Sequence, residues 1–296
     1  MPRLELTLSG RQLIWHRFRT SSLGKVLGQF SGALGTILIL AIIFVAIFAP
    51  CLTPHDPDVI DVFNKLAPPS KTHLMGTDEL GRDLFTRILY GSRIALIVSL
   101  PAIGIGVIIS MLLGVIAGYG STWVGSLLLI LFDSVRAFPT IIFAITIMAL
   151  TGGANLPILI AVIGITRFPG YSRLIRVQTL KVRENDYISA AKGTGCSYMR
   201  IVFRHILPNA IGPLFIQAAM DIPVVITIEA GLSFLGLGVP PPTPSWGAVL
   251  RSGYAYVRTS PWMVVFGGLA LIVATLGFTL LGETLRDVFD PKLRRA

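Results

Sequence analysis

Residues 94–120 read IALIVSLPAIGIGVIISMLLGVIAGYG and contain no charged side chain. The stretch is longer than the ~20 apolar residues that an α-helix needs to cross the hydrocarbon core of a bilayer. A helix also satisfies its own backbone hydrogen bonds, which lipid cannot do. These residues therefore predict a membrane-spanning helix, and the rest of the chain decides how many others accompany it.

Three more windows lack Asp, Glu, Lys and Arg, between residues 25 and 56, 136 and 167, and 258 and 283. Only 14% of the 296 residues are charged, against about a quarter in an average soluble domain. We therefore expect an all-α integral membrane protein rather than a soluble fold. The most economical division gives six transmembrane helices, over residues 33–49, 94–117, 126–150, 157–168, 209–237 and 262–281.

Lys and Arg residues set the expected orientation. Most of the 25 fall in the amino-terminal leader, between Arg167 and Arg204, and in the tail, and cytoplasmic segments carry such an excess. We expect both termini in the cytoplasm, and we ascribe the net charge of +10 to this asymmetry rather than to a nucleic-acid partner. The expected divisions are a basic leader (1–30), a first transmembrane helix (31–53), an extracytoplasmic segment (54–92), a core domain (93–285) and a cytoplasmic tail (286–296).

Residues 181–208 are too polar to cross a membrane and have a pattern of their own. Helical pieces over 184–192 and 197–207 flank Gly193-Thr194-Gly195, and Pro208 is expected to close the second piece. One face of that piece is expected to hold Tyr198, Ile201, Val202, His205 and Ile206, while Arg200 and Arg204 project from another. Such a unit is suited to docking on a partner.

Ala190-Ala191, Gly195 and Leu207-Pro208 are similar to the cytoplasmic signature of permeases in binding-protein-dependent ABC importers. Two positions differ, since Ser189 replaces the usual glutamate and His205 the usual isoleucine. The resemblance implies a coupling element that sits in a groove of a separate ATPase subunit. The expected coupling residues are Ser189, Ala190, Ala191, Gly195, Arg200, Arg204, Leu207 and Pro208. The alternative is a small-residue turn that serves helix packing alone.

Three other segments resemble the C-type permease subunit of dipeptide, oligopeptide and nickel importers. They are GTDELGRD at residues 76–83, SFLGLG at 233–238, and Arg286-Asp287 followed by Asp290-Pro291-Lys292. The first suits a turn that caps a helix beginning near Asp83, which is a structural role. The resemblance implies a type I ABC importer permease bundle in a bacterial inner (plasma) membrane, forming half of a pathway for di- or oligopeptides. Nickel, opines and glutathione stay open as substrates.

Ionisable residues within the expected helices should point inward, because a charge facing lipid costs roughly 2.5 to 3.5 kcal/mol at the bilayer centre. Asp133 and Arg136 stand three residues apart and are expected to form a structural pair, with substrate contact as the alternative. Asp221 and Glu229 are candidates to line the pathway and meet a substrate ammonium group, with packing between subunits as the alternative.

Phe234, Gly236 and Gly238 stand where the fifth expected helix ends. Glycines there let the chain turn or let backbones approach closely, as a gate near the outer face requires. We therefore expect these three residues to be candidate gate residues. Tight packing alone explains the glycines equally well.

Motifs for ATP hydrolysis and for other catalysis are absent from the sequence. The chain has no G-x-x-x-x-G-K-[ST] phosphate-binding loop, His-Glu-x-x-His or G-x-S-x-G motif. We expect no enzyme activity and no cofactor on this chain, with ATP and Mg²⁺ bound by partner subunits. The partners that the resemblance implies are a homologous second permease, two ATPase subunits, an extracytoplasmic solute-binding protein and the lipid bilayer.

Two other classes of protein stay open. An ion-coupled secondary carrier or channel would use Asp221 and Glu229 as proton or cation sites, but too few helices and no visible internal repeat count against it. A membrane-embedded enzyme would need a nucleophile with its base, which the sequence does not supply.

Overall fold

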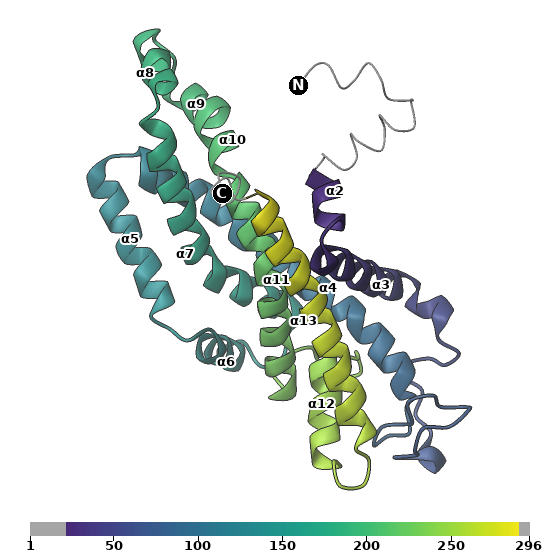
Figure 1. The fold of residues 1–296 in the computed structure, drawn as a ribbon. Coiled ribbons are helices and arrows are strands. Elements are labelled where there is room, and N and C mark those ends of the chain that lie inside the picture. Colours follow the sequence, from purple (N-terminus) through teal and green to yellow (C-terminus); the bar gives the residue numbers. More distant parts are fainter. Residues whose placement is uncertain (1–21, 290–296) are drawn as a thin grey trace, which may run out of the picture.

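The computed structural model describes residues 22–289, and every regular element within that range is a helix (Figure 1). The helices are α2 (Ser22–Leu27), α3 (Phe30–Leu52), the 3-10 helix η1 (Val62–Asn64), α4 (Leu84–Tyr119), α5 (Thr122–Arg136), α6 (Thr140–Leu150), α7 (Leu156–Arg183), α8 (Asp186–Gly193), α9 (Tyr198–Ile201), the π-helix η2 (Val202–Ile206), α10 (Leu207–Ala210), α11 (Gly212–Phe234), α12 (Trp246–Ala255) and α13 (Trp262–Phe289). Most of the expected leader (1–30) and of the expected tail (286–296) lies outside the described residues.

Five of these helices, α3, α4, α7, α11 and α13, are each long and apolar enough to cross a membrane. The bent pair of α5 and α6 meets the same test when its two helices are taken together. The expected all-helical membrane architecture is therefore confirmed for residues 22–289.

The prediction of a single helix over residues 126–150 is wrong, because the structure has two helices there. α5 ends at Arg136, α6 begins at Thr140, and the two helices are bent by 81° relative to each other. Pro139 lies at the break. Proline has no N–H to donate and disfavours the helical conformation of the residue before it, so the chain turns there.

α7 is far longer than the helix expected over residues 157–168, because it passes through the buried Pro169 and ends at Arg183. The end of α4 stabilises this extension. Arg176 Nε donates to the carbonyl of Ala117 at 3.2 Å, and an Arg183 Nη1 donates to that of Gly118 at 3.1 Å. These carbonyls belong to the last turn of α4, where no further helical N–H is available. These hydrogen bonds from the basic residues of α7 therefore stabilise its additional turns.

α4 and α7 pack closely along their lengths. A Cβ added at Gly114 would lie 2.7 Å from the Cβ of Ile175, and one added at Gly164 would lie 2.8 Å from the carbonyl of Ala102. Small residues at such positions let the two backbones approach, which is a main source of association between membrane helices. Ile163 and Ile175 are fully buried in the main apolar cluster along this contact.

The two ends of the bundle differ in what they carry (Figure 1). The turn between α8 and α9, helix α2 and the last turn of α13 lie at one end, and residues 54–83 with α12 lie at the other. Because α2 and the end of α13 share one end, the described chain crosses the bundle an even number of times. This arrangement agrees with six crossings once α5 and α6 count as one.

Candidate coupling element and translocation path

The turn after α8 is a Schellman motif, and this motif explains Gly195. The φ angle of Gly195 is +77°, in the left-handed region that costs a residue with a Cβ roughly 1–2 kcal/mol. Its N–H donates to the carbonyl of Lys192, and the N–H of Cys196 donates to that of Ala191, both at 3.0 Å. These bonds satisfy carbonyls that the end of α8 leaves without helical partners. The spacing of Ala191 and Gly195 in the sequence is therefore the spacing of a helix cap.

The second limb of the element does not end at Pro208, as the sequence analysis expected. The chain continues from α9 through the π-helix η2 into α10, and Pro208 lies in the first turn of α10. The N–H of Leu207 donates to the carbonyl of Val202, five residues earlier. Pro208 has no N–H, and the first turn of a helix is where that loss is tolerated.

One face of this limb packs on the rest of the protein. Ile201 and Ile206 are buried in a small cluster with Val182 of α7 and Ile188 of α8. Val202 is buried as well, so three of the five residues expected on the apolar face are confirmed there. Of the other two, Tyr198 is exposed and lies 4.8 Å from Tyr119 between ring centroids, while His205 is half-buried.

The opposite face of the element is open to solvent. Ala191 and Leu207 are half-buried. The other expected coupling residues are exposed, and they are Ser189, Ala190, Gly195, Arg200, Arg204 and Pro208. The element thus presents a surface of small residues with two guanidinium groups, at the end of α7 and away from residues 54–83 (Figure 1).

Asp221 of α11 has a charged partner that the sequence analysis missed. An Arg167 Nη1 of α7 lies 3.9 Å from Asp221 Oδ2, and Gln217 Nε2 donates to Asp221 Oδ1 at 3.3 Å. The side chains of Arg167 and Asp221 keep 20% and 15% of their surface exposed. Arg167, the first residue of the stretch expected to be cytoplasmic, lies well inside α7. Recognising that one helix continues over residues 157–183 would have placed Arg167 inside it.

Glu229 lies two turns further along α11, in a different environment. It is only 1% exposed, and Ser233 Oγ donates to its carboxylate at 2.7 Å. The N–H of Val239 donates in turn to Ser233 Oγ at 3.3 Å. Glu229 therefore points inward, as expected, but it stabilises the exit of α11 and is not brought together with Asp221.

Of the three candidate gate residues, Phe234 is the last residue of α11, and Gly236 and Gly238 follow it. Gly236 has φ +81° and closes a second Schellman motif, in which its N–H donates to the carbonyl of Ser233 at 3.0 Å. A Cβ at Gly236 would overlap the guanidinium of Arg251, and one at Gly238 would overlap Ser233. Phe234 is 36% exposed and meets Tyr254 edge-on at 5.9 Å. The two glycines are required by turning and close packing, whatever further role they have.

Asp133 and Arg136 do not form the expected pair. Asp133 instead forms an ion pair with Arg173 of α7. α5 packs along α7, so an arginine on the facing helix reaches the carboxylate from across the contact. Both partners remain exposed, at 59% for Asp133 and 39% for Arg173.

Residues 76–83 form a compact turn around the carboxylate of Asp78 and cap α4. Asp78 Oδ1 accepts from the backbone N–H groups of Leu80 and Arg82, both at 2.9 Å, and Asp78 Oδ2 accepts from Arg82 Nε at 2.7 Å. Asp83 Oδ2 accepts from the N–H of Thr86 at 2.8 Å. The expected capping turn is confirmed.

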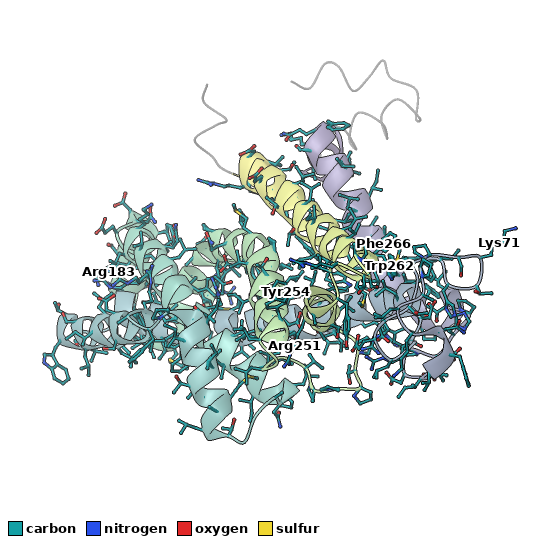
Figure 2. The ribbon with its side chains drawn as sticks, turned by 90° about the horizontal axis from the view of Figure 1, so that it is seen from below. Lys71, Arg183, Arg251, Tyr254, Trp262 and Phe266 are labelled. Carbon is teal, nitrogen blue, oxygen red and sulfur yellow. The ribbon has the colours of Figure 1, made fainter. Side chains whose placement is uncertain are left out.

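A polar cavity of about 220 Å³ lies between this turn, the end of α11 and α12. Arg82, Arg87 and Arg251 line it, together with Asp78 and Glu79. Figure 2, viewed from this end, shows Arg251 and Tyr254 near the middle of the molecule and Lys71 at its edge.

On the 54–83 segment, the side chain of Asn64 and the backbone N–H of Phe63 donate to Asp61 and hold the pKa of that carboxyl below its usual value.

A helical bundle with several membrane crossings, a polar helix–turn–helix at one end and ion pairs between its helices is the architecture of a transport permease. Residues 106–295 match the family described as "Binding-protein-dependent transport system inner membrane component". Residues 31–69 match the "N-terminal TM domain of oligopeptide transport permease C". The chain belongs to the family of binding-protein-dependent transport system inner membrane components. It is therefore a multi-pass inner-membrane permease subunit of an ABC importer and not itself an enzyme, and the family implies ATPase and solute-binding-protein partners.

Curated relatives match nearly the whole chain. The dipeptide transport system permease protein DppC of Alkalihalophilus pseudofirmus is 41% identical over 88% of this chain and 85% of its own length. The di/tripeptide permease DppC of Pseudomonas aeruginosa is 39% identical over 90% of this chain and 89% of its own. The glutathione permease GsiD of Pectobacterium atrosepticum is 36% identical over 95% and 90%. The resemblance inferred from sequence motifs is confirmed.

A solved structure shows the same fold. It is an inward-facing form of the MetNI methionine ABC transporter, and a chain of it matches with a TM-score of 0.57 and 17% identity. The match covers 69% of this chain and 97% of that one. At this identity the likeness supports the type I permease bundle alone.

Proposed function

We propose that this chain forms one half of the pathway of an ATP-driven importer for di- or oligopeptides, with a homologous second permease forming the other half. The substrate class rests on the relatives, which are named for dipeptides, di/tripeptides and glutathione. The two-permease arrangement rests on the ion pairs Asp221–Arg167 and Asp133–Arg173, which keep exposed surface on helices that cross the membrane. Charges at that depth are expensive against lipid, so a path or a second subunit must cover them.

The coupling element of the proposed importer is the helix–turn–helix over residues 186–210. Its exposed face of small residues lets a partner approach the backbone, and Arg200 and Arg204 offer charge-assisted hydrogen bonds at its edge. Two ATPase subunits would bind ATP and Mg²⁺ and move this element, and the bundle would switch between inward-open and outward-open states as a rigid body. The end carrying α8 would then face the cytoplasm, and residues 54–83 would face the solute-binding protein.

The test compares two glycines that flank one threonine. Neither Gly193 nor Gly195 has atoms within 4 Å of an added Cβ, but only Gly195 has a positive φ. Gly195→Val therefore distorts the turn, while Gly193→Val adds the same side chain to an ordinary helical position. We expect Gly195→Val to lower peptide uptake more than about 10-fold in cells that express the complete transporter, because a strain of roughly 1–2 kcal/mol displaces the docking surface. Gly193→Val should retain most of the uptake, and both proteins should reach the membrane in equal amounts.

A cross-linking experiment separates coupling from simple folding. In a background with Cys51 and Cys196 replaced by serine, Ala190→Cys should cross-link to an ATPase subunit. It should react with an impermeant maleimide only in inverted vesicles. Normal uptake by Gly195→Val, or labelling of position 190 from outside intact cells, would overturn the coupling assignment.

A further inference from the structure

Two histidines and an aspartate meet on residues 54–83, at the end of the bundle opposite α8. The rings of His55 and His73 stack with 5.0 Å between centroids and 29° between planes. Asp83 Oδ1 lies 2.9 Å from His73 Nδ1. One ligand atom from each of the three residues lies within 4.8 Å of the other two, and no other such group of His, Cys, Asp or Glu side chains occurs in residues 22–289.

Hydrogen bonds already orient these side chains. Asp83 Oδ2 accepts from the N–H and the hydroxyl of Thr86, at 2.8 and 2.7 Å, which leaves Oδ1 directed toward His73. His55 Nε2 lies 3.1 Å from the carbonyl of Thr72. A metal-bound histidine commonly donates its second ring N–H to such a carbonyl, which fixes the ring and leaves the other nitrogen for the metal.

One spacing within the group already fits a small coordination polyhedron. With bonds of about 2.1 Å and angles of about 90–109°, neighbouring ligand atoms lie about 3.0–3.4 Å apart. The 2.9 Å between His73 and Asp83 is close to that range, and a shift of the exposed His55 ring brings its ligand atom, which lies within 4.8 Å of the other two, into the same range. Two imidazoles and one carboxylate favour Zn²⁺, Ni²⁺ or Cu²⁺, whereas Mg²⁺ and Ca²⁺ prefer ligand sets made of oxygen.

We propose that His55, His73 and Asp83 bind a divalent transition-metal ion such as Zn²⁺, which ties the beginning and the middle of the 54–83 segment to the N-cap of α4. The ion takes the place of the hydrogen bond between His73 and Asp83, and a neutral His73 that binds it through Nδ1 carries its proton on Nε2. Its role is structural. Residues 55–83 carry a single short 3-10 helix, and a metal that closes this stretch restricts the unfolded chain and stabilises the folded one.

The test uses the purified full-length chain without a polyhistidine tag, stripped with chelator and titrated with Zn²⁺ against a chromophoric zinc indicator. His205 is a matched control, because it lies on η2 at the other end of the bundle. We expect the wild-type chain and His205→Gln to show the same saturable binding, and His55→Gln to weaken its tightest component more than about 10-fold, since even an outer-shell change has that effect. Mg²⁺ should not compete.

Thermal unfolding of the same proteins gives a second measurement. Added Zn²⁺ should raise the midpoint of the wild-type chain and of His205→Gln, but not that of His55→Gln. His55 is a surface residue, so its variant should fold even if His73→Gln does not. Equal zinc affinity of His55→Gln and the wild-type chain, or the absence of saturable binding by the wild-type chain, would show that the cluster is only a hydrogen bond between His73 and Asp83.

Discussion

A single carboxylate organises residues 76–83. Asp78 is 3% exposed, and its two oxygens hold two backbone N–H groups and the guanidinium of Arg82, while Arg87 Nε lies 3.5 Å away. Arg87 also donates to the carbonyl of Pro57 at 2.8 Å. Asp78 thus pairs with both buried arginines and closes the turn, while Glu79 pairs with Arg82 alone and Asp58 with Arg87 alone.

Replacing Asp78 by alanine should destabilise the protein strongly. Two arginines would remain buried with a weaker set of partners, and removing one member of a buried pair costs about 3–5 kcal/mol. The measurement is the thermal unfolding midpoint of the full-length chain in detergent. Asp56→Ala is the control, because Asp56 is exposed and accepts from the N–H of Asp58 at 2.8 Å. A similar small shift for both variants would contradict the role assigned to Asp78.

Gly195 and Gly236 show what the sequence reveals at this scale. Both were recognised as special positions from their motifs, and both prove to close Schellman motifs with positive φ. The pairing of a helix end with a glycine is local, so the sequence predicts it. What each turn touches is not local. The guanidinium of Arg251 against Gly236 comes from a different helix and carries no signal in the sequence.

The limb from α9 to α10 shows how burial sets helical register. In an α-helix, residues five apart are separated by about 140° around the axis. Ile201 and Ile206 are nonetheless buried in the same cluster, because the π-helix between them widens the turn. Burying each isoleucine stabilises by about 1.5–3 kcal/mol, against about 0.5–1.5 kcal/mol for one backbone hydrogen bond. The apolar face therefore decides the register, and Pro208 merely permits it.

This comparison predicts opposite results for two substitutions. Ile206→Ala should cost about 2–5 kcal/mol and open the limb, so that trypsin cleaves the full-length chain faster after the exposed Lys192 and Arg200. Pro208→Ala restores one N–H and should leave the cleavage rate close to that of the wild-type chain. The rates are read from the decay of intact protein under limited digestion. If Pro208→Ala accelerated cleavage as much as Ile206→Ala, the proline and not the apolar face would hold the π register.

The long helices were predictable for a physical reason that the broken ones lack. Lipid requires long runs without charge, so α3, α4 and α13 can be read directly from the sequence. α6 was hidden because it is as apolar as its neighbours and only Pro139 marks the bend. The length of α7 was missed because its second half is basic, and those arginines find partners on α4 that only the fold supplies.

The pair of Arg167 and Asp221 joins α7 to α11 among helices that cross the membrane. The two residues are 54 positions apart in the chain, so no periodicity relates them, and the sequence indicates Asp221 without indicating its partner. Their partial exposure bears on whether the pair is structural or lines the pathway. A purely structural pair would be expected to be fully enclosed, whereas a pair that meets water or substrate must keep an open side.

A double-mutant cycle separates these two roles. Asp221→Asn leaves Arg167 with a neutral partner, so the thermal midpoint should fall, and the double variant Arg167→Gln/Asp221→Asn should regain much of that loss because no unpaired charge remains. Peptide uptake should stay low in both variants, since the charges that would meet the termini of a peptide are gone. Asp56→Asn is the control, because Asp56 is exposed and lies outside the membrane-spanning helices, so both measurements should stay close to those of the wild-type chain. Recovery of uptake together with stability in the double variant would make the pair a structural link between α7 and α11 and would move the pathway elsewhere.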